Sequence, residues 1–514
     1  MTRLGFVIDH AKCIGCHACT VACKAENHVP LGKFRTWVKY TEAGQFPAVK
    51  RSFAVLRCNQ CSDAPCMTIC PTSALFKRHD GIVDLDSENC IGCKSCMQAC
   101  PYDALYIDEE HGTAEKCHFC AHRTELGLAP ACAVVCPTEA IIPGDFDDPD
   151  SVVSRLKARG DLTARKEEAG TRPNVWYREA DPAGLQPTTT NAAGGYLWAN
   201  QIPGDPLDAE RFLAEAEQHS ARTVYDVDHK TWWGARVSAY LLTKSMSAGL
   251  ALAPLLAFDA ESGRLPEGLA LLSPLLSLLF LAITGVLLVT DLKRPDRVLL
   301  MLTRPNWDSW LIKGSLALLA HGAAQGLWLL IGVLGISPGA ALGGLLAAFG
   351  GLSALAAAVY TAWLFRQAKG RVLWMKRGLE LDLALQALLA GGATCAFLAP
   401  ALGLALQPFA ALTAAAALGL LALSFAEPKL SPPGREVEFA RAVALLHRGP
   451  FASAHRGALC ALGVSAALGL AGLLWTPGLL LATGLGLLLL AGAATALALL
   501  ETSFVRAGQA LPIS

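Results

Sequence analysis

Sixteen of the eighteen cysteines lie within the first 136 residues, in four groups of four. The first and third groups have the spacing C-x2-C-x2-C-x3-C, and proline follows the closing cysteine of three groups. Three cysteines at this spacing direct their thiolates at one inorganic cube, while the fourth usually ligates the other cluster of a pair. Sixteen thiolates, at four per cluster, therefore predict four [4Fe–4S] clusters and electron transfer. In sequence order the cysteines are Cys13, Cys16, Cys19, Cys23, Cys58, Cys61, Cys66, Cys70, Cys90, Cys93, Cys96, Cys100, Cys117, Cys120, Cys132 and Cys136.

Disulfide bonds and zinc sites are the alternatives for so many cysteines. Disulfide frameworks belong mainly to small secreted domains, and the first thirty residues show no secretory or twin-arginine signal. Zinc ribbons use two C-x2-C pairs separated by a dozen or more residues. Only the fourth group could bind zinc by its own spacing, but its C-x3-C-P ending matches the other groups. The pattern favours iron–sulfur clusters.

The rest of the chain is strongly apolar. The hydrophobic fraction of 53% exceeds the globular average, and the excess begins near Val237. Long runs rich in Leu, Ala and Gly recur there, each close to the 17–25 residues that cross a bilayer. Eight such runs in succession favour membrane spans over the buried helices of a large soluble protein. The runs are 237–258, 268–290, 310–335, 340–365, 381–404, 408–426, 457–475 and 478–500.

We therefore expect an α+β ferredoxin-like iron–sulfur domain of duplicated dicluster units, followed by an all-α membrane domain of eight transmembrane helices. The cluster domain is expected over 1–180, with a short helix in PDSVVSRLKARGDL and a closing strand in NVWYRE. Residues 181–236 are expected to form a surface tether that ends in an interfacial anchor at Trp232 and Trp233, because Trp favours the membrane–water boundary. Residues 237–514 are expected to form the membrane domain.

The basic residues of the loops predict the topology. Loops on the side of the cysteine domain hold fifteen Lys and Arg residues, whereas the opposite loops hold only Arg264. Basic loops favour the cytoplasm. We expect a multi-pass protein of the prokaryotic cytoplasmic (inner) membrane, with the cluster domain and both termini on the cytoplasmic side. An exported partner with its own signal would reverse this orientation.

The cysteine domain resembles the four-cluster electron-transfer subunits of molybdopterin oxidoreductases, of the dimethyl-sulfoxide, polysulfide and nitrite reductase type. CIGCHACTVACKAEN, RCNQCSDAPCMTICPTSAL, CIGCKSCMQACPYDAL and KCHFCAHRTELGLAPACAVVCPTEAI carry this resemblance over about 4–180. It implies that ligands interleave between distant groups. The implied sets are Cys13, Cys16, Cys19 and Cys136 for cluster 1; Cys23, Cys117, Cys120 and Cys132 for cluster 2; Cys58, Cys61, Cys66 and Cys100 for cluster 3; and Cys70, Cys90, Cys93 and Cys96 for cluster 4.

The membrane half resembles the quinone-reactive anchors of the NrfD, PsrC and DmsC group, over about 230–510. TWWGARVSAYLLTKSMSAG, VTDLKRPDRVLLMLTRPNWDSWLIKG and the ending ETSFVRAGQALPIS carry this resemblance. It implies electron exchange between the clusters and a membrane quinone or quinol, which is an exchangeable substrate. The two units are usually separate polypeptides and would here be fused. The implied partners are a molybdopterin-type catalytic subunit, a quinone and the lipid bilayer, with no nucleic acid.

Ionisable residues inside spans are rare and are candidates for function. Lys244, Asp291 and His321 are the candidates for quinone binding and proton transfer. Their structural alternatives are a snorkelling lysine, an interfacial salt bridge and a packing histidine.

Haem b would need a pair of axial histidines within the spans, and only His321 lies inside one, so we expect no haem. Further residues that could line the same pocket are Tyr240, Arg304, Asn306, Trp310, Gln325, Tyr360 and Asp382. Glu427 and Glu501 are expected to be interfacial, and Cys395 and Cys460 to pack as small apolar residues.

Three functions are compatible with these patterns. The first is an electron-transfer and membrane-anchor subunit of a respiratory oxidoreductase, which joins the quinone pool to a catalytic subunit. The second is an energy-coupling module, in which quinone chemistry moves protons through Lys244, Asp291 and His321. The third is an anchor without quinone chemistry. The sequence shows no G-x-G-x-x-G after a strand and no P-loop, so we expect no nucleotide site.

Overall fold

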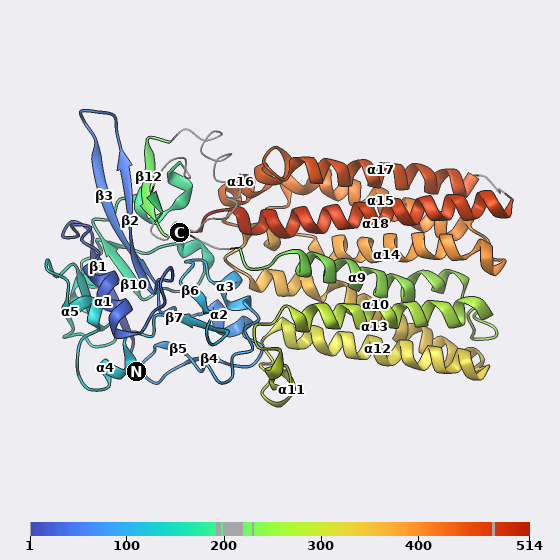
Figure 1. Cartoon of the computed structure of the whole chain (residues 1–514), viewed down its shortest axis with the longest axis horizontal. Helices are drawn as coiled ribbons and strands as arrows, with labels where there is room; N and C mark the ends of the chain where they lie inside the picture. Colours follow the sequence, from blue (N-terminus) through green and yellow to red (C-terminus); the bar gives the residue numbers. More distant parts are fainter. Residues whose placement is uncertain (1, 192–196, 199–218, 229–230, 475–477, 514) are drawn as a thin grey trace.

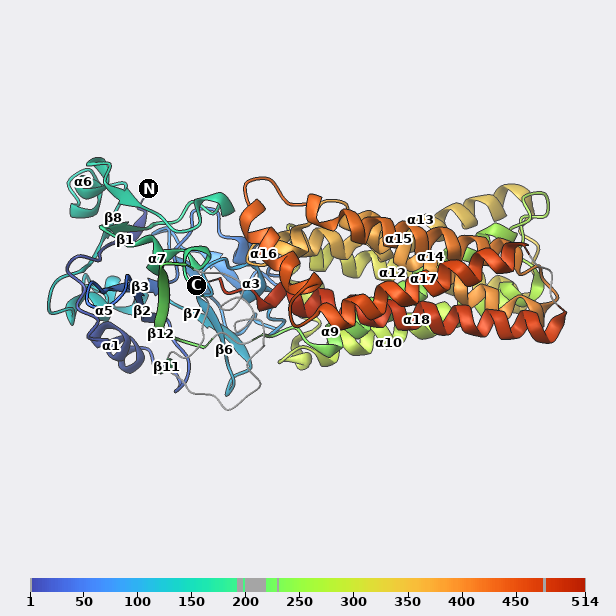
Figure 2. The ribbon, with the colours of Figure 1, turned by 90° about the horizontal axis from the view of Figure 1, so that it is seen from above.

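The computed structural model describes all residues except 1, 192–196, 199–218, 229–230, 475–477 and 514. The cysteine domain, built of strands and short helices, lies at one end of a long helical bundle (Figures 1 and 2). The protein thus has the two parts that the sequence predicted, an α+β domain followed by an all-helical one.

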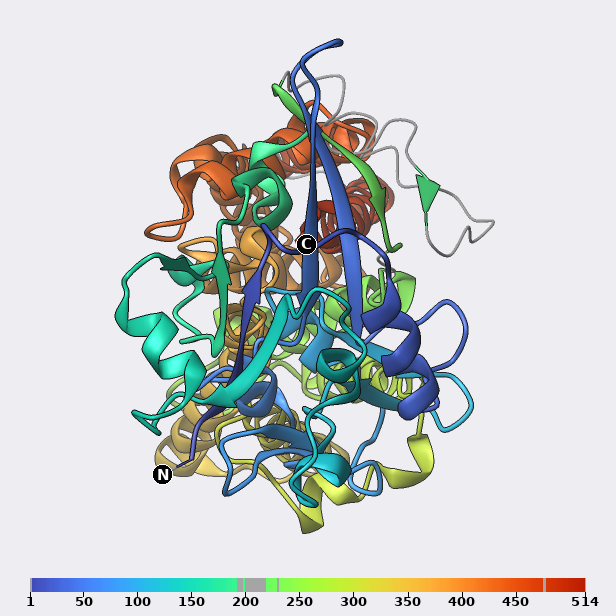
Figure 3. The same ribbon diagram turned by 90° about the vertical axis from the view of Figure 1, so that its left-hand side faces the viewer.

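Two four-stranded sheets form the frame of the cysteine domain. The first has the order β8-β1-β10-β9 and the second β11-β12-β2-β3, and two separate hairpins pair β4 with β5 and β6 with β7. The hairpin of β2 and β3 extends beyond the rest of the domain (Figure 3). The strands are β1 (Leu4–Asp9), β2 (Thr36–Ala43), β3 (Lys50–Arg57), β4 (Leu75–Lys77), β5 (Val83–Leu85), β6 (Leu105–Asp108), β7 (Thr113–Lys116), β8 (Ile141–Asp145), β9 (Leu162–Thr163), β10 (Val175–Arg178), β11 (Leu197–Trp198) and β12 (Ala221–Asp226).

Short helices alternate with these strands, and five of them lie within or beside the cysteine groups. Two glycines make the tight turns of the first and third groups possible. Gly15 and Gly92 both have positive φ, 72° and 65°, a conformation that costs glycine little. The helices are α1 (Ala18–Glu26), α2 (Pro65–Ile69), α3 (Ser95–Ala99), α4 (Ala121–Thr124), α5 (Ala131–Val134), α6 (Val152–Ala158) and α7 (Pro182–Leu185). Helix α6 and strand β10 confirm the helix and the closing strand predicted before residue 180.

Among the described residues of the second domain, eight helices are long and apolar enough to span a membrane, which confirms the predicted number of spans. Helix α9 continues as a 3₁₀ turn at Pro254, because proline removes a helical hydrogen bond. The last helix continues ten residues past its predicted end, so Glu501 lies inside it and is buried. The spans are α9 (Ala235–Leu252), α10 (Glu267–Thr290), α12 (Trp310–Leu334), α13 (Gly339–Gln367), α14 (Leu379–Leu398), α15 (Gln407–Ala426), α17 (Ala452–Leu474) and α18 (Leu479–Ala510); α11 (Leu300–Thr303) and α16 (Glu436–His447) are shorter.

Part of the predicted tether belongs to the cysteine domain. Strand β12 pairs antiparallel with β2, and most of the remaining tether lies outside the described residues. The interfacial anchor predicted for Trp233 is wrong. Trp233 is 6% exposed and stacks on Trp374, with ring centroids 5.3 Å apart. Its indole is therefore enclosed by protein.

A buried amide joins the two domains. The Oε1 atom of Gln509, near the end of α18, accepts hydrogen bonds from the Trp232 and Trp233 N–H groups and from Nε2 of Gln98, at 3.0 to 3.1 Å. Gln98 lies in α3 of the cysteine domain, and its own Oε1 accepts from Nε of Arg371 at 2.8 Å. Since buried polar groups need partners, this network fixes how the cysteine domain is seated on the bundle.

Replacing Gln509 with leucine is expected to weaken the seating of the cysteine domain. The N–H groups of Trp232, Trp233 and Gln98 would lose their acceptor, and each buried group left unsatisfied costs about 1–3 kcal/mol. Thermal unfolding of the full-length protein in detergent should begin at a lower temperature. Gln186→Ala, at an exposed position, is the control, and equal unfolding of the two variants would contradict the prediction.

Candidate iron–sulfur and membrane sites

One pocket of the cysteine domain is lined by cysteines from two different groups. Cys90, Cys93 and Cys96 of the third group meet Cys70, which closes the second. The backbone N–H of Ala114 donates to the sulfur of Cys90 at 3.4 Å. This pocket, which we call the Cys70–Cys96 pocket, is thus lined by the four cysteines that the resemblance implies for cluster 4.

A second pocket brings Cys117, Cys120 and Cys132 together with Cys23, which closes the first group. Arg57 lines it and is fully buried, and its Nε and Nη1 atoms have no hydrogen-bond partner among the described residues. Burial alone would lower the pKa of Arg57, but the sulfurs of Cys132 and Cys117 outweigh it and raise that pKa. Free donors beside four cysteines fit an anionic iron–sulfur cluster, whose sulfurs accept hydrogen bonds.

The remaining cysteines also lie near one another. Burial raises the pKa of Cys61, and the nearby Cys58, Cys66 and Cys100 raise it further. Burial likewise raises the pKa of Cys13, with contributions from Cys136 and Cys16. Buried thiols resist ionisation unless a cation balances the thiolate, and the iron of a cluster would supply that charge. Burial also raises the pKa of Cys19, with contributions from Cys132 and Cys13, so all sixteen positions fit [4Fe–4S] ligation.

The Cys70–Cys96 pocket contacts the segments that precede and connect the membrane helices. Nδ2 of Asn306 donates to the Cys70 carbonyl at 2.8 Å, and Nη1 of Arg297 donates to the Cys90 carbonyl at 3.2 Å. Nε1 of Trp233 donates to the Cys93 carbonyl at 3.4 Å. The first cysteine group lies at the other end of the domain, beside α1 (Figure 1), where Cys16 is exposed.

Asp291 lies at this boundary between the domains. Its carboxylate pairs with Nζ of Lys94 at 2.7 Å, and Lys94 follows Cys93 in the sequence. The sequence anticipated a salt bridge for Asp291 but not a partner in the cysteine domain. Asp291 thus contacts the cysteine domain, whereas Lys244 and His321 have their hydrogen-bond partners inside the bundle.

Lys244 is buried in the interior of the bundle, with 1% of its surface exposed. Its ammonium donates to the Ala358 carbonyl and to Oγ1 of Thr361, both at 2.7 Å, and lies 5.0 Å from the centroid of the Tyr360 ring. A lysine held by two acceptors within the bundle is not snorkelling. Tyr240, on the same helix, is also buried.

His321, on α12, is fully buried and faces α9. Its Nε2 lies 3.1 Å from the Ser247 hydroxyl and 3.2 Å from the Ser277 hydroxyl, and Nδ1 has no partner among the described residues. Ser247 follows Lys244 by three residues on α9, so both side chains lie on one side of that helix. The structure thus gathers two of the three predicted membrane candidates.

A second group of buried charges was not expected from the sequence. The ammonium of Lys376 pairs with Asp382 at 2.5 Å and with Glu427 at 3.0 Å. Burial alone would lower the pKa of Lys376, but Asp382 and then Glu427 outweigh it and raise that pKa. Gln386 continues the group through a 3.3 Å hydrogen bond to Asp382. Charged residues close to span ends were the only signal, and the sequence treated Glu427 as interfacial although it is 2% exposed.

The other predicted pocket residues are dispersed. Asn306 serves domain docking, Trp310 stacks on Trp363 with centroids 4.6 Å apart, and Arg304 is exposed. Gln325 lines a separate cavity with Trp328 and Pro254. Cys395 is buried as expected for packing, whereas Cys460 is exposed on the surface of the bundle.

Comparison with known proteins agrees with this two-part organisation. The 4Fe-4S dicluster domain family matches residues 49–146, and the family described as polysulphide reductase, NrfD, matches residues 223–420. A tetrathionate reductase subunit of Salmonella typhimurium is 43% identical over 200 residues, which cover 38% of this chain and 80% of that protein. The present protein belongs to the same family of reductase iron–sulfur subunits as this relative. It carries an NrfD-type membrane domain in the same polypeptide.

Two further relatives match the same part of the sequence. A polysulfide reductase chain of Wolinella succinogenes is 38% identical over 187 residues, 36% of this chain and 98% of that protein. Protein NrfC of Escherichia coli is 42% identical over 178 residues, 34% of this chain and 79% of that protein. The fusion subunit is therefore an iron–sulfur electron-transfer protein of the reductase type. The expectation that no haem binds stays a prediction.

Replacing Arg57 with methionine should lower the reduction potential of one cluster. The guanidinium stabilises the more negative, reduced form through charge and hydrogen bonds to sulfur. Redox titration followed by electron paramagnetic resonance measures this shift, with the iron content unchanged. Arg51→Met, at an exposed position on β3, is the control. An unaltered set of potentials in the Arg57 variant would contradict this role.

Proposed function

We propose that this fusion subunit passes electrons between a molybdopterin-type catalytic subunit and the membrane quinone pool through four [4Fe–4S] clusters. The clusters would be held by the four cysteine sets implied by the family resemblance. Two of these sets line single pockets. The site of quinone chemistry would lie in the bundle, on the side of the cysteine domain.

The position of the Cys70–Cys96 pocket against the membrane domain is the main support for this proposal. Carbonyls of three cysteines in this pocket accept hydrogen bonds from Asn306, Arg297 and Trp233. A cluster bound there would lie directly against the membrane domain, which a docking anchor without redox chemistry would not require. This observation favours quinone exchange over the simple anchor.

The opposite end of the cysteine domain supplies a surface for the catalytic partner. Cys16 is exposed there, and exposed apolar side chains come from α1, from α5 and from nearby loops. Exposed apolar side chains of this kind are suited to protein–protein contact, and docking there would place the partner's redox centre beside cluster 1. These side chains are Ile14, Val21, Leu126, Leu128, Val134 and Val135.

Lys244 is the residue we assign to quinone chemistry, with His321 as a proton-exchanging neighbour. A quinone oxygen needs a hydrogen-bond donor and a proton source as it is reduced. The ammonium of Lys244 can supply both at the edge of the ring, and its contact with Tyr360 keeps the surroundings apolar. Asp291 is proposed to act at the boundary with Lys94.

Replacing Lys244 with methionine should slow the reduction of the clusters by a quinol analogue by at least about tenfold, a loss typical of one proton-transfer group. Reduction by dithionite should be unchanged, because the clusters are untouched. Stopped-flow absorbance measures both rates. Lys313→Met, an exposed lysine near the same end of the bundle, is the control and should react normally.

The same variant separates quinone binding from energy coupling. Buried polar groups around Lys244 and His321 favour a coupling role as the second candidate function. Under that function Lys244→Met would abolish charge movement in proteoliposomes while quinone turnover persists. Normal quinol-driven reduction of the clusters together with normal charge movement would contradict both roles of Lys244.

We propose that the cluster domain faces the cytoplasm of a prokaryotic cell. A specific protease site inserted between Leu31 and Gly32, where Leu31 is 95% exposed, should be cut in inverted membrane vesicles and protected in spheroplasts. A site inserted between Ala260 and Glu261, at the other end of the bundle, is the control and should behave in the opposite way. Cleavage of the first site in spheroplasts would place the domain on the outer face.

A further inference from the structure

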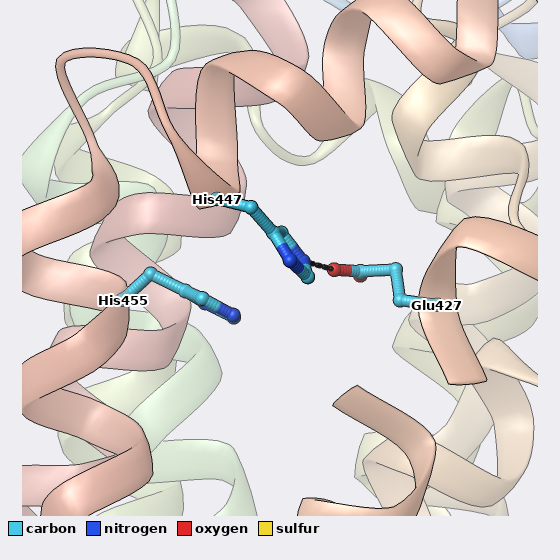
Figure 4. Close-up of side chains that lie close together, drawn as sticks. All are labelled: Glu427, His447 and His455. Atoms are coloured by element: carbon cyan, nitrogen blue, oxygen red, sulfur yellow. Dashed lines mark hydrogen bonds and ion pairs between the residues drawn. The ribbon is translucent and has the colours of Figure 1, made fainter. Parts of the chain in front are cut away.

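Three potential metal ligands converge where the cysteine-domain side of the bundle is formed by α15, α16 and α17. Glu427 follows α15, His447 ends α16, and His455 lies in the first turn of α17. Their ligand atoms all lie within 4.8 Å of one another. Figure 4 shows the three side chains directed into one space. The NrfD family match ends at residue 420, before all three residues.

His455 is the observation that points to a ligand. It is 3% exposed, and neither ring nitrogen has a hydrogen-bond partner among the described residues. Its ring stacks on that of His447, with centroids 4.7 Å apart and an interplanar angle of 29°. A buried imidazole without partners is unfavourable, whereas neutral imidazole nitrogen is the commonest protein ligand for transition metals.

The charges around the site favour the binding of a cation. The ammonium of Lys376 pairs with both Asp382 and Glu427, so two carboxylates share this ammonium. The Oε1 atom of Glu427 contacts Lys376. Its other oxygen, Oε2, lies 2.9 Å from Nε2 of His447 and faces the histidines. The pair of carboxylates can therefore balance a second positive group on that side.

We propose that Glu427, His447 and His455 form a zinc site. Two imidazoles and one carboxylate are a donor set that zinc uses, at bond lengths of about 2.0–2.2 Å with water in an open fourth position. Small side-chain rotations would bring three atoms within 4.8 Å to the spacing of a tetrahedral site. His447 is 28% exposed at its side chain and provides access for the metal and for the water.

The site would tie α16 to the two spans that flank it. Helix α16 also contacts the cysteine domain: Glu438 pairs with Lys166 at 3.5 Å, and Arg441 donates to the Thr188 carbonyl at 2.6 Å. A metal bound at the end of α16 would therefore hold a helix that clamps the cysteine domain. This role is separate from quinone chemistry and does not rest on the proposed function.

Metal analysis of the purified full-length protein tests the site. After exposure to equimolar zinc and removal of free metal, about one zinc per molecule is expected, with nitrogen and oxygen neighbours at about 2.0–2.2 Å in zinc-edge X-ray absorption. Sulfur neighbours near about 2.3 Å would instead identify zinc bound to cluster cysteines and would overturn the proposal. Zinc content should not vary inversely with iron content.

Variants at the three ligand positions provide a second test of the zinc site. His447→Gln keeps a donor for Glu427 and lies at a partly exposed position, so folding is retained while zinc falls at least tenfold. His455→Ala should have the same effect, and His111→Ala, at an exposed histidine paired with Asp108, should not. Added zinc should raise the unfolding temperature of the parent protein and leave that of His447→Gln unchanged. Absence of zinc from the parent protein, or full zinc in both site variants, would show that His447 and Glu427 form only a hydrogen-bonded pair.

Discussion

The contact between the second and third cysteine groups and the connecting segments of the membrane domain is the constraint on which the remaining structure depends. Under the proposed function, electrons pass to a membrane carrier from a cluster that lies against the membrane domain. The contact is made by the carbonyls of Cys70, Cys90 and Cys93, which accept hydrogen bonds from Asn306, Arg297 and Trp233. The Gln98–Gln509–Arg371 network surrounds this contact with buried hydrogen bonds. Because the partners are buried, moving the domain would leave several polar groups unsatisfied.

The contact between the two domains also affects the topology prediction, which was based on the basic residues of the loops. Arg294, Arg297 and Arg441 donate to carbonyls of the cysteine domain, so these residues are needed for docking whichever side of the membrane the domain occupies. The positive-inside argument for the topology therefore rests on the basic loop residues other than these three arginines. These residues include Arg304, Lys313, Lys429, Arg448 and Arg456. Some of the basic residues that make the loop charge asymmetric thus also dock the cysteine domain.

The polar interior of the bundle has two separate parts. Lys244 is held by Ala358 and Thr361, with His321 and two serines further along α9 and its neighbours. Lys376, Asp382 and Glu427 form a compact charged group close to the histidines of α16 and α17. Each charge in these groups is buried with a partner, as the low dielectric of a membrane protein requires. The first part contains the proposed site of quinone chemistry, and the second lies beside the proposed zinc site.

The sequence by itself determined the cofactor chemistry and the two-part architecture, because ligand spacing and span length are local properties. Cysteines in a C-x2-C-x2-C run must surround one cube, and a span must be long and apolar. The sequence could not determine that Asp291 pairs with Lys94, that Trp233 is enclosed by protein, or that Glu501 and Glu427 are buried. Only the tertiary structure decided these points, since each depends on a contact between segments distant in the sequence. The convergence of Glu427, His447 and His455 likewise arises from the packing of three helices, which no local spacing records.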